Sequence, residues 1–484
     1  MTAPTAAAPA GSTCNVLILK SDEHNPRVLS TAGHPYAQTP NFDRLATAGV
    51  VYENAYCPSP LCCPSRSSFI SGRPVHEIQC YNNSMAVPRP NFPSYGKVLA
   101  AAGAHTVHVG RVGAYRPPEE LGFSEMHGRS FGGPGDVYIS RVPLALRPDG
   151  LERAEGVGVR PDPFRADDHR MAQALEFLDR ASELDRPWTM EVNLATPHFP
   201  HHVTQQLWDQ HAGHDDLPEH GADAAPAHHP YARDLRRHFG FGAFTEQRTR
   251  AHRRAYYGRV SYVDAQLGLL LDKLKETGQA ERTVVAYTSD HGEMLGQFGM
   301  WFKCSMYEES ARVPLIAAGP GFSPGTRTRT PVTQWDLGAA IFAAVGVRRP
   351  GEMAGQPLQQ VAPDDPDRVV FSEYHGHGVR GSAFMVRQGR WKLIYNAKAS
   401  HQLYDLEADP YELRNLAESD QPAVRRLTER LHDEFCDPEL EQKRAEAFIQ
   451  RQLAALESGV QSERGISPGG GVSSPLDGDQ RDVP

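Results

Sequence analysis

The chain has 484 residues, of which 39% are hydrophobic and 23% are charged, with a formal net charge of -9. This composition is ordinary for a globular protein, and the negative charge argues against a general nucleic-acid binder. No apolar run approaches the roughly 20 residues that span a bilayer, and the length favours a large domain with a smaller companion.

Polar side chains follow several strand-like runs in the first part of the chain. After a tip at 1–14 that we expect to be disordered, strand patterns alternate with helical patterns from 15 to about 318, as a parallel α/β sheet requires. Ligands in open α/β sheets bind beyond the carboxyl ends of the strands, so we expect the polar endings to converge on one crevice. The strands and their endings are 16–19 before 21–24, 190–194 before 196–198, and 284–287 before 289–293.

Helices and further strands are predicted between these runs. The run 167–184 has Met171, Ala174, Leu175 and Leu178 on one face, which is typical of an amphipathic helix. Residues 201–250 are rich in His, Asp, Ala and Pro, and we expect them to form a surface excursion over the crevice. The other predictions are helices at 41–48, 94–102 and 255–276 and strands at 50–56 and 105–109.

The last part of the chain predicts a smaller unit. Strand-like runs at 369–371, 383–386 and 391–395 indicate a small antiparallel sheet, backed by a helix over 422–435. From Gly459 onward Gly, Ser, Pro and Asp dominate, which is typical of a disordered tail. We therefore predict a catalytic domain over 15–365, a smaller C-terminal subdomain over 366–440, and a helix with a flexible tail over 441–484.

A cysteine motif is the most informative feature of the sequence. Cys62-Cys63-Pro64-Ser65-Arg66 opens a helix-like run. A cysteine beside a proline that fixes a turn and an arginine that carries a permanent charge can be a nucleophile, although a single cysteine is more often an inert buried thiol. The chain has seven scattered cysteines, which do not suggest a disulfide framework, and no secretion signal at 1–11, so we expect a reducing cytoplasm.

Together with these clusters, the motif resembles that of type I sulfatases of the alkaline phosphatase superfamily, especially bacterial choline-sulfatase-like and aryl-sulfatase-like members. Sulfatases carry a C-x-P-S-R motif in which the first cysteine is oxidised to formylglycine, and Cys62 occupies that position. The resemblance implies a large mixed, mostly parallel sheet sandwiched by helices, with a smaller C-terminal antiparallel sheet plus helix. Other matching stretches are 39–45, 290–293, Lys303, 308–314 and 403–416.

The resemblance also implies catalytic roles. As formylglycine, Cys62 would hydrate to a gem-diol; one hydroxyl would attack sulfur, and the second would lose a proton to expel sulfate. Arg66 would hold the formylglycine region. Lys303 would contact the sulfate oxygens, and His198 would contact sulfate and protonate the leaving oxygen. The alternative for each is an ordinary structural or surface role.

Strand-end carboxylates that face the predicted nucleophile are candidate metal ligands. These are Asp22, Asp290 and His291, with Glu23 as a further candidate and the modified Cys62 side chain beside them. A divalent cation would lower the pKa of a bound hydroxyl and neutralise charge on the transferred group. Oxygen-rich ligation favours Ca²⁺ or Mg²⁺, while the imidazole of His291, where many sulfatases have asparagine, leaves Mn²⁺ or Zn²⁺ open; we predict one Ca²⁺.

The chain departs from the family at one element. Sulfatases commonly carry G-K-x-H after the strand that we predict at 105–109, and this chain has Gly110-Arg111-Val112-Gly113. Arg111 would bind the substrate in place of the lysine, but Gly113 cannot replace the imidazole. From the smaller unit, His375 or His377 would face the substrate, with a surface turn as the alternative.

We therefore predict a metal-dependent sulfuric ester hydrolase that cleaves a small-molecule sulfate monoester. A formylglycine-generating enzyme would be its maturation partner; no nucleic-acid or membrane partner is expected, and a homo-oligomer is left open. One alternative is a phosphonate monoester or phosphodiester hydrolase on the same scaffold, because both reactions stabilise a tetrahedral oxyanion. A second alternative is a catalytically impaired binding homologue, because of Gly113.

Overall fold

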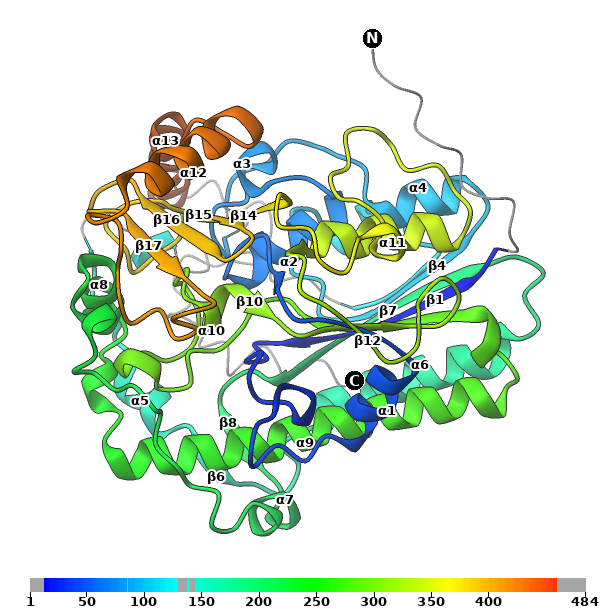
Figure 1. Ribbon diagram of the computed structural model, residues 1–484. Coiled ribbons are helices and arrows are strands. Elements are labelled where there is room, and N and C mark those ends of the chain that lie inside the picture. The colour runs from blue at the N-terminus through cyan, green and yellow to red at the C-terminus, as the bar shows by residue number, and fades with distance from the viewer. Residues whose placement is uncertain (1–12, 85, 129–136, 140–143, 459–484) are drawn as a thin grey trace.

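The protein is built around a large twisted sheet (Figure 1). The computed structural model describes residues 13–84, 86–128, 137–139 and 144–458, so most of the predicted N-terminal tip and the tail from 459 lie outside the described residues. Strand β1 pairs in parallel with β7 and β9, whereas β11 is antiparallel to both of its neighbours. The predicted large mixed, mostly parallel sheet is confirmed. Within the described residues its order is β12 (Thr326–Thr328), β2 (Gly49–Tyr52), β11 (Leu315–Ala318), β9 (Thr283–Ser289), β1 (Asn15–Asp22), β7 (Trp188–Pro197), β4 (His105–Gly110) and β5 (Glu125–His127).

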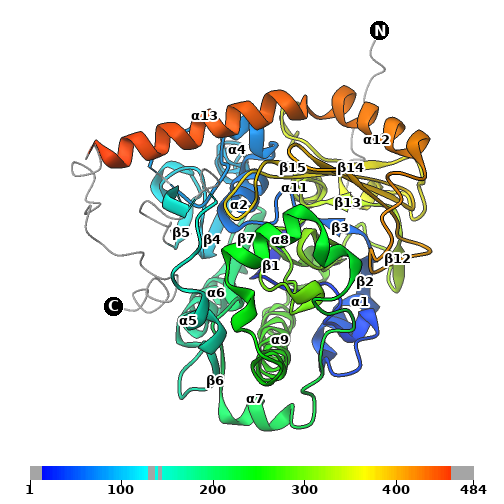
Figure 2. The same cartoon turned by 90° about the vertical axis from the view of Figure 1, so that its left-hand side faces the viewer.

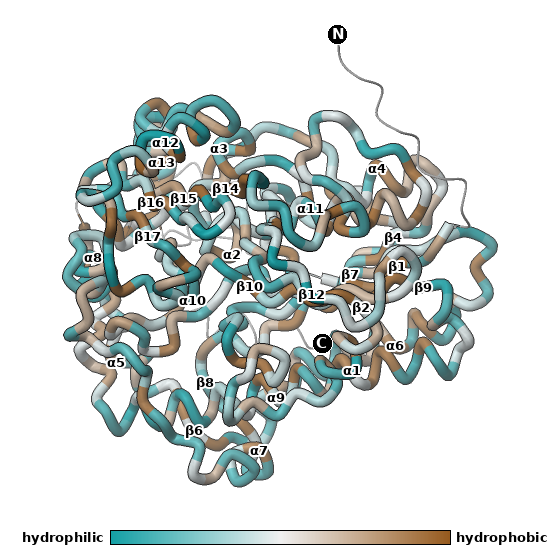
Figure 3. Tube along the Cα trace, viewed as in Figure 1, coloured by the Kyte–Doolittle hydropathy of each residue, from teal (hydrophilic) through white to brown (hydrophobic). Residues whose placement is uncertain are grey.

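Helices cover both faces of this sheet, as the alternation of side chains along a strand requires. Val16 and Ile18 of β1 pack into the cluster above the sheet, while Leu17 and Leu19 pack into the cluster below it. Figure 3 shows the central strands as hydrophobic stretches. The upper helices are α2 (Cys62–Ser71), α4 (Tyr95–Ala101) and α11 (Gln334–Ala344); the lower ones are α1 (Pro40–Ala48), α6 (Arg165–Ala181) and α9 (Glu246–Glu276) (Figure 1).

The predicted smaller sheet is confirmed at the C-terminal end. It is antiparallel throughout, and helix α12 (Gln421–Glu434) packs against β15 and β16. The backbone N–H of Glu373 donates to Pro58 O at 3.0 Å, so this sheet borders the segment that leads to Cys62. Its strands are β14 (Val369–Tyr374), β15 (Ala383–Gln388), β16 (Trp391–Asn396) and β17 (Gln402–Asp405).

Some predicted elements differ from those observed. The single strand predicted at 50–56 is two, because after β2 the chain turns and β3 (Ala55–Tyr56) joins β10 (Arg312–Val313) and β13 (Val332–Thr333) in a separate small sheet. Helix α9 begins at Glu246 rather than at 255, with the Thr245 side chain accepting from the N–H of Arg248 as a cap. None of the described helices has the length and apolar character needed to cross a membrane.

The expected excursion at 201–250 is largely structured. It contributes a short strand beside β6 and helices that pack against the chain near Trp301 and Tyr307. Its α-helices and strands are β8 (His201–Val203), α7 (Gln205–Gln210) and α8 (Pro230–His238). Elsewhere the described residues also form β6 (Val157–Val159), α3 (Val75–Ile78), α5 (Gly150–Glu155), α10 (Glu308–Ala311) and α13 (Pro438–Glu457).

An ion pair joins α3 to the smaller sheet. Nδ1 of His76 lies 3.0 Å from Oε1 of Glu373; the side chain of His76 is 9% exposed and that of Glu373 is fully buried. Against the effect of burial, the charge of Glu373 raises the pKa of His76 from 6.5 to about 8. The same attraction, acting against burial, lowers the pKa of Glu373, which therefore stays ionised from pH 6 to pH 9. The pair thus stabilises the contact between the two units while His76 is protonated.

Replacing His76 by glutamine is expected to destabilise the protein more at pH 6 than at pH 9. Because the folded-state pKa of His76 is raised, its contribution is fully present below about pH 6.5 and is lost as the pH rises through about 8. The shift corresponds to about 2 kcal/mol at pH 6. Denaturant unfolding at both pH values measures the difference, with the exposed His432→Gln as the control. Equal losses at both pH values would contradict the assignment.

Candidate active site

The polar strand endings meet at one edge of the central sheet. In the parallel register Ser21 lies opposite Ser289, which places Asp22 next to Asp290. On the other side of β1, Asp22 pairs with Pro197, the residue before His198. The predicted convergence of these endings is confirmed. It follows from a parallel sheet, in which the carboxyl ends of adjacent strands share one edge.

Cys62 lies at the start of α2 and faces this edge. Its Sγ is 3.3 Å from Nε2 of His291 and 3.9 Å from Oδ1 of Asp22. Nδ1 of His291 donates to Gly292 O at 3.0 Å, so Nε2 is the ring nitrogen that faces the carboxylates. Burial, followed by the charge of Asp22, raises the pKa of Cys62 to about 12. Asp22, Cys62, Asp290 and His291, here called the Cys62 cluster, each offer a buried donor atom within 4.8 Å of the others.

Two arginines orient the carboxylates of the Cys62 cluster. Arg66 donates from Nη2 to Oδ2 of Asp22 at 3.1 Å and from Nε to Oδ2 of Asp290 at 2.9 Å. Arg111 donates from Nη1 to Oδ2 of Asp22 at 2.7 Å. Burial would raise the pKa of Asp22, but the cations around it, Arg111 foremost, hold that pKa well below its usual value. The Oδ1 atoms of both aspartates remain near Nε2 of His291, at 3.8 and 3.6 Å, so the donor set suits a divalent cation.

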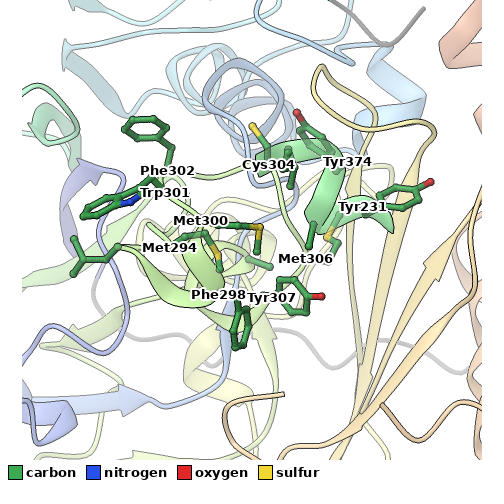
Figure 4. Close-up of a cluster of buried hydrophobic side chains, with 14 of the residues drawn as sticks. Tyr231, Met294, Phe298, Met300, Trp301, Phe302, Cys304, Met306, Tyr307 and Tyr374 are labelled. Carbon is green, nitrogen blue, oxygen red and sulfur yellow. The ribbon is translucent and has the colours of Figure 1, made fainter. Parts of the chain in front are cut away.

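A second group of polar side chains contains Lys303. Its Nζ lies 2.7 Å from Nε2 of His198 and 3.2 Å from Oε2 of Glu23. Nδ1 of His198 donates to Phe199 O, and burial followed by the charge of Lys303 lowers the pKa of His198 well below its usual value. His198 is therefore neutral and accepts a hydrogen bond from the ammonium of Lys303. Figure 4 shows the buried cluster that holds Phe302 and Cys304, the residues on either side of Lys303.

Glu23 is placed with Lys303 rather than in the Cys62 cluster. Burial raises the pKa of both Glu23 and its neighbour Glu293, the latter to about 7. Oε1 of Glu23 is buried and has no hydrogen-bond partner among the described residues. Asp22, Glu23 and His198 form a second set of potential donors, in which Asp22 is shared with the Cys62 cluster.

Sequence reasoning missed a buried network beneath Arg66. Its Nη1 donates to Oδ1 of Asn193 at 2.6 Å, and Nδ2 of Asn193 donates to Oε1 of Glu191 at 3.1 Å. Lys20 of β1 completes the network with a 2.7 Å bond from Nζ to Oε1 of Glu191. The sequence signal that could have revealed this network is the presence of the polar residues Lys20, Glu191 and Asn193 inside otherwise apolar strands. The network fixes the plane of the guanidinium that holds Asp22 and Asp290.

The remaining predicted residues lie in different places. Gly113 has φ +53°, and a Cβ there would come within 3.0 Å of Cδ of Arg66, so Arg66 fills the space that a side chain at 113 would need. Nε2 of His377 is 4.0 Å from Sγ of Cys304, beside Lys303. His375 instead contacts Glu373 and Ser382, both at 2.8 Å. Among the described residues, the His-rich stretch at 211–238 does not form a cluster of metal donors.

Comparisons with known proteins show what the chain is similar to. Residues 15–347 match the family model Sulfatase, and 296–441 match the model N-sulphoglucosamine sulphohydrolase, C-terminal. Choline-sulfatase of Rhizobium meliloti (strain 1021) is 31% identical over 433 residues, which cover 86% of this chain and 84% of that protein. The solved structure of BT4656 in complex with D-glucosamine-2-N,6-O-disulfate has a TM-score of 0.70 at 21% identity, covering 88% and 99% of the two chains. Phosphonate monoester hydrolase from Silicibacter pomeroyi has a TM-score of 0.70 at 23% identity, covering 86% and 94%.

Proposed function

The chain belongs to the sulfatase family, a family of sulfuric ester hydrolases, and from this premise we propose that it cleaves a small-molecule sulfate monoester by means of an aldehyde derived from Cys62 and one divalent cation. The observation that carries the proposal is the Cys62 cluster. In this cluster Cys62, the residue that the motif predicts to be modified, lies beside two carboxylates and the imidazole of His291, all buried at the edge of the sheet.

The cation would stabilise negative charge in the reaction, and the aldehyde would supply the nucleophile. Asp22, Asp290 and His291 would hold the cation, which would neutralise charge on the transferred group and lower the pKa of a bound hydroxyl. The hydrated aldehyde at 62 would supply a hydroxyl nucleophile that a thiol lacks. We propose Ca²⁺, with Mn²⁺, Mg²⁺ and Zn²⁺ as the alternatives, because the donor set combines carboxylate oxygens with one nitrogen.

The remaining side chains would bind sulfate and supply a proton. Hydrolysis breaks the bond between sulfur and the alcohol oxygen, and that oxygen must gain a proton as it leaves. Nζ of Lys303 donates to Nε2 of His198, and we propose that the pair contacts the sulfate oxygens and protonates the leaving oxygen. Arg111 donates to Oδ2 of Asp22 at 2.7 Å, which supports a role in orienting that carboxylate, and we propose sulfate binding as its second role.

We further propose the biological setting and domain division that the sequence predicts. A formylglycine-generating enzyme would modify Cys62, and the protein would act in the cytoplasm on a small substrate. The catalytic domain would extend over 15–365, with a smaller subdomain over 366–440. His377, which lies beside Cys304, is the better placed of the two histidines of this subdomain to meet the substrate.

Turnover of p-nitrophenyl sulfate and of a phenyl phosphonate ester, compared on one preparation, tests the proposed function. We expect the sulfate to be the better substrate by kcat/KM. A chelator should abolish turnover, and adding back Ca²⁺, Mn²⁺, Mg²⁺ or Zn²⁺ one at a time identifies the cation. Faster turnover of the phosphonate would favour the phosphonate hydrolase. If no sulfate is released from a broad ester panel although Cys62 is modified and metal is bound, the protein is a binding homologue.

A further inference from the structure

A hollow of about 420 Å³ lies between α3 and α13, and its lining shares no residue with the Cys62 cluster or with Lys303 and His198. The two helices are held together by buried contacts of Val75 and Tyr81 with Ala445 and Phe448. Figure 2 shows α13 as a long helix that crosses the top of the molecule above α2 and α4. A hollow of this size is in the range of small-ligand sites.

Three groups able to carry positive charge line the hollow. Arg444 and Arg451 come from the same side of α13, and His76 comes from α3. Arg444 donates from Nη1 to Oε1 of Glu441 at 2.6 Å, and the guanidinium of Arg451 lies over the ring of Phe448. Each guanidinium has five N–H donors, so these contacts leave donors for a ligand. The acidic residue of the lining, Glu77, lies 3.0 Å from Nη1 of Arg73.

His76 is held rigidly against the hollow. Its side chain is 9% exposed, and both its backbone N–H and Nδ1 bond to Glu373, whose other oxygen bonds to Nε2 of His375. This leaves Nε2 of His76 as the nitrogen without a hydrogen-bond partner among the described residues. Glu373 also keeps the imidazole protonated near neutral pH, because it raises the pKa of His76 to about 8 against the effect of burial. The hollow is therefore lined by an imidazole that is held in place by Glu373 and is protonated near neutral pH.

We propose that this hollow is a second anion site that binds a sulfate-like oxyanion through His76, Arg444 and Arg451. A fixed imidazolium and two guanidiniums around one hollow provide the charge-assisted donors that tetrahedral oxyanions prefer. The anion can be a free inorganic ion or a sulfate group on a larger molecule, because the hollow has room for more than one sulfate.

Equilibrium dialysis with radioactive inorganic sulfate at pH 7 tests this site on the full chain. The variant Arg444→Gln/Arg451→Gln should lose one binding site, or bind that sulfate at least about tenfold more weakly, because it removes two of the three charge-assisted donors of the site. The control Arg425→Gln/Arg426→Gln removes the same charge from exposed positions of α12 and should bind like the wild type. Neither variant touches the catalytic machinery, so turnover of p-nitrophenyl sulfate should stay unchanged in both.

Two further measurements locate the anion and its source. Crystals soaked in sodium selenate should give an anomalous peak within hydrogen-bond distance of Nε2 of His76. Glucosamine 6-sulfate should displace the radioactive sulfate at lower concentration if the site takes a sulfate group on a larger molecule, and at equal or higher concentration if it takes the free ion. The proposal would be overturned if the α13 variant bound sulfate like the wild type, or if the α12 control lost as much binding as the α13 variant. It would also be overturned by a selenate peak without a matching site in dialysis, which would mean an adventitious ion only. If the proposed sulfatase function is wrong, turnover of p-nitrophenyl sulfate will be absent, but the α13 variant will still bind less sulfate than the α12 control.

Discussion

Cys62→Ala is expected to abolish hydrolysis of p-nitrophenyl sulfate, while Cys63→Ala keeps most of it. Loss of a catalytic nucleophile typically costs about 10⁴-fold or more in kcat. Both cysteines are buried in the first turn of α2, and both substitutions remove the same sulfur, so the pair separates chemistry from packing. Cys63 packs against Ile78 and Cys80, away from the carboxylates, and its N–H keeps its bond to Asn83 after substitution.

Two measurements check this result together. Steady-state kinetics give kcat for each variant, and mass spectrometry of the peptide from Cys57 to Arg73 shows which cysteine carries an aldehyde or its hydrate. We expect the modification at 62 in the wild type and in Cys63→Ala. Turnover by Cys62→Ala above a hundredth of the wild-type rate would contradict the proposed nucleophile. Modification found at Cys63 alone would contradict the position assigned by the motif.

The main features of the fold were predictable because burial and strand order leave strong local signals. The run 16–19 is apolar without alternation, as a strand covered on both faces must be, and the polar residues that follow it mark the carboxyl end. Elements whose bounds or packing depend on tertiary contacts were harder to predict from the sequence. The first two turns of α9 are polar and basic, so their helical period is hidden, and α8 packs partly through His238 and Tyr231 instead of a simple apolar stripe.

The residues of the candidate site likewise include some that the sequence could predict and some that it could not. Asp22, Asp290 and His291 could be predicted because they lie at or just after the carboxyl ends of β1 and β9, which are parallel neighbours in the sheet. Lys303 could be named only by resemblance, since it lies in a loop whose course is set by the buried cluster around Phe302. The pairing of Asn193 with Arg66 depends on the register between strands and on the approach of α2, which the sequence does not specify. The consequence of Gly113 was also hidden, because the side chain that fills its space comes from α2.

Lys303→Met is expected to lower kcat for p-nitrophenyl sulfate by about 10²–10³-fold, the usual cost of removing one preorganised charge from a developing oxyanion. Methionine retains an unbranched chain among Phe302 and Cys304, so packing should be largely preserved. Bound metal should stay at the wild-type level, because Nζ contacts His198 and Glu23 and not the donors of the Cys62 cluster.

Lys303→Arg is the matched variant that separates charge from geometry. It keeps a cation that cannot give up its proton, so it should bind sulfate but protonate the leaving oxygen poorly. We therefore expect its deficit to be greatest for esters of weakly acidic alcohols and small for p-nitrophenyl sulfate, whose leaving group needs little protonation. Metal analysis and kcat across a series of leaving groups measure both effects. An equal deficit for every ester would assign Lys303 to sulfate binding alone, and loss of metal from Lys303→Met would place it in the support of the cation instead.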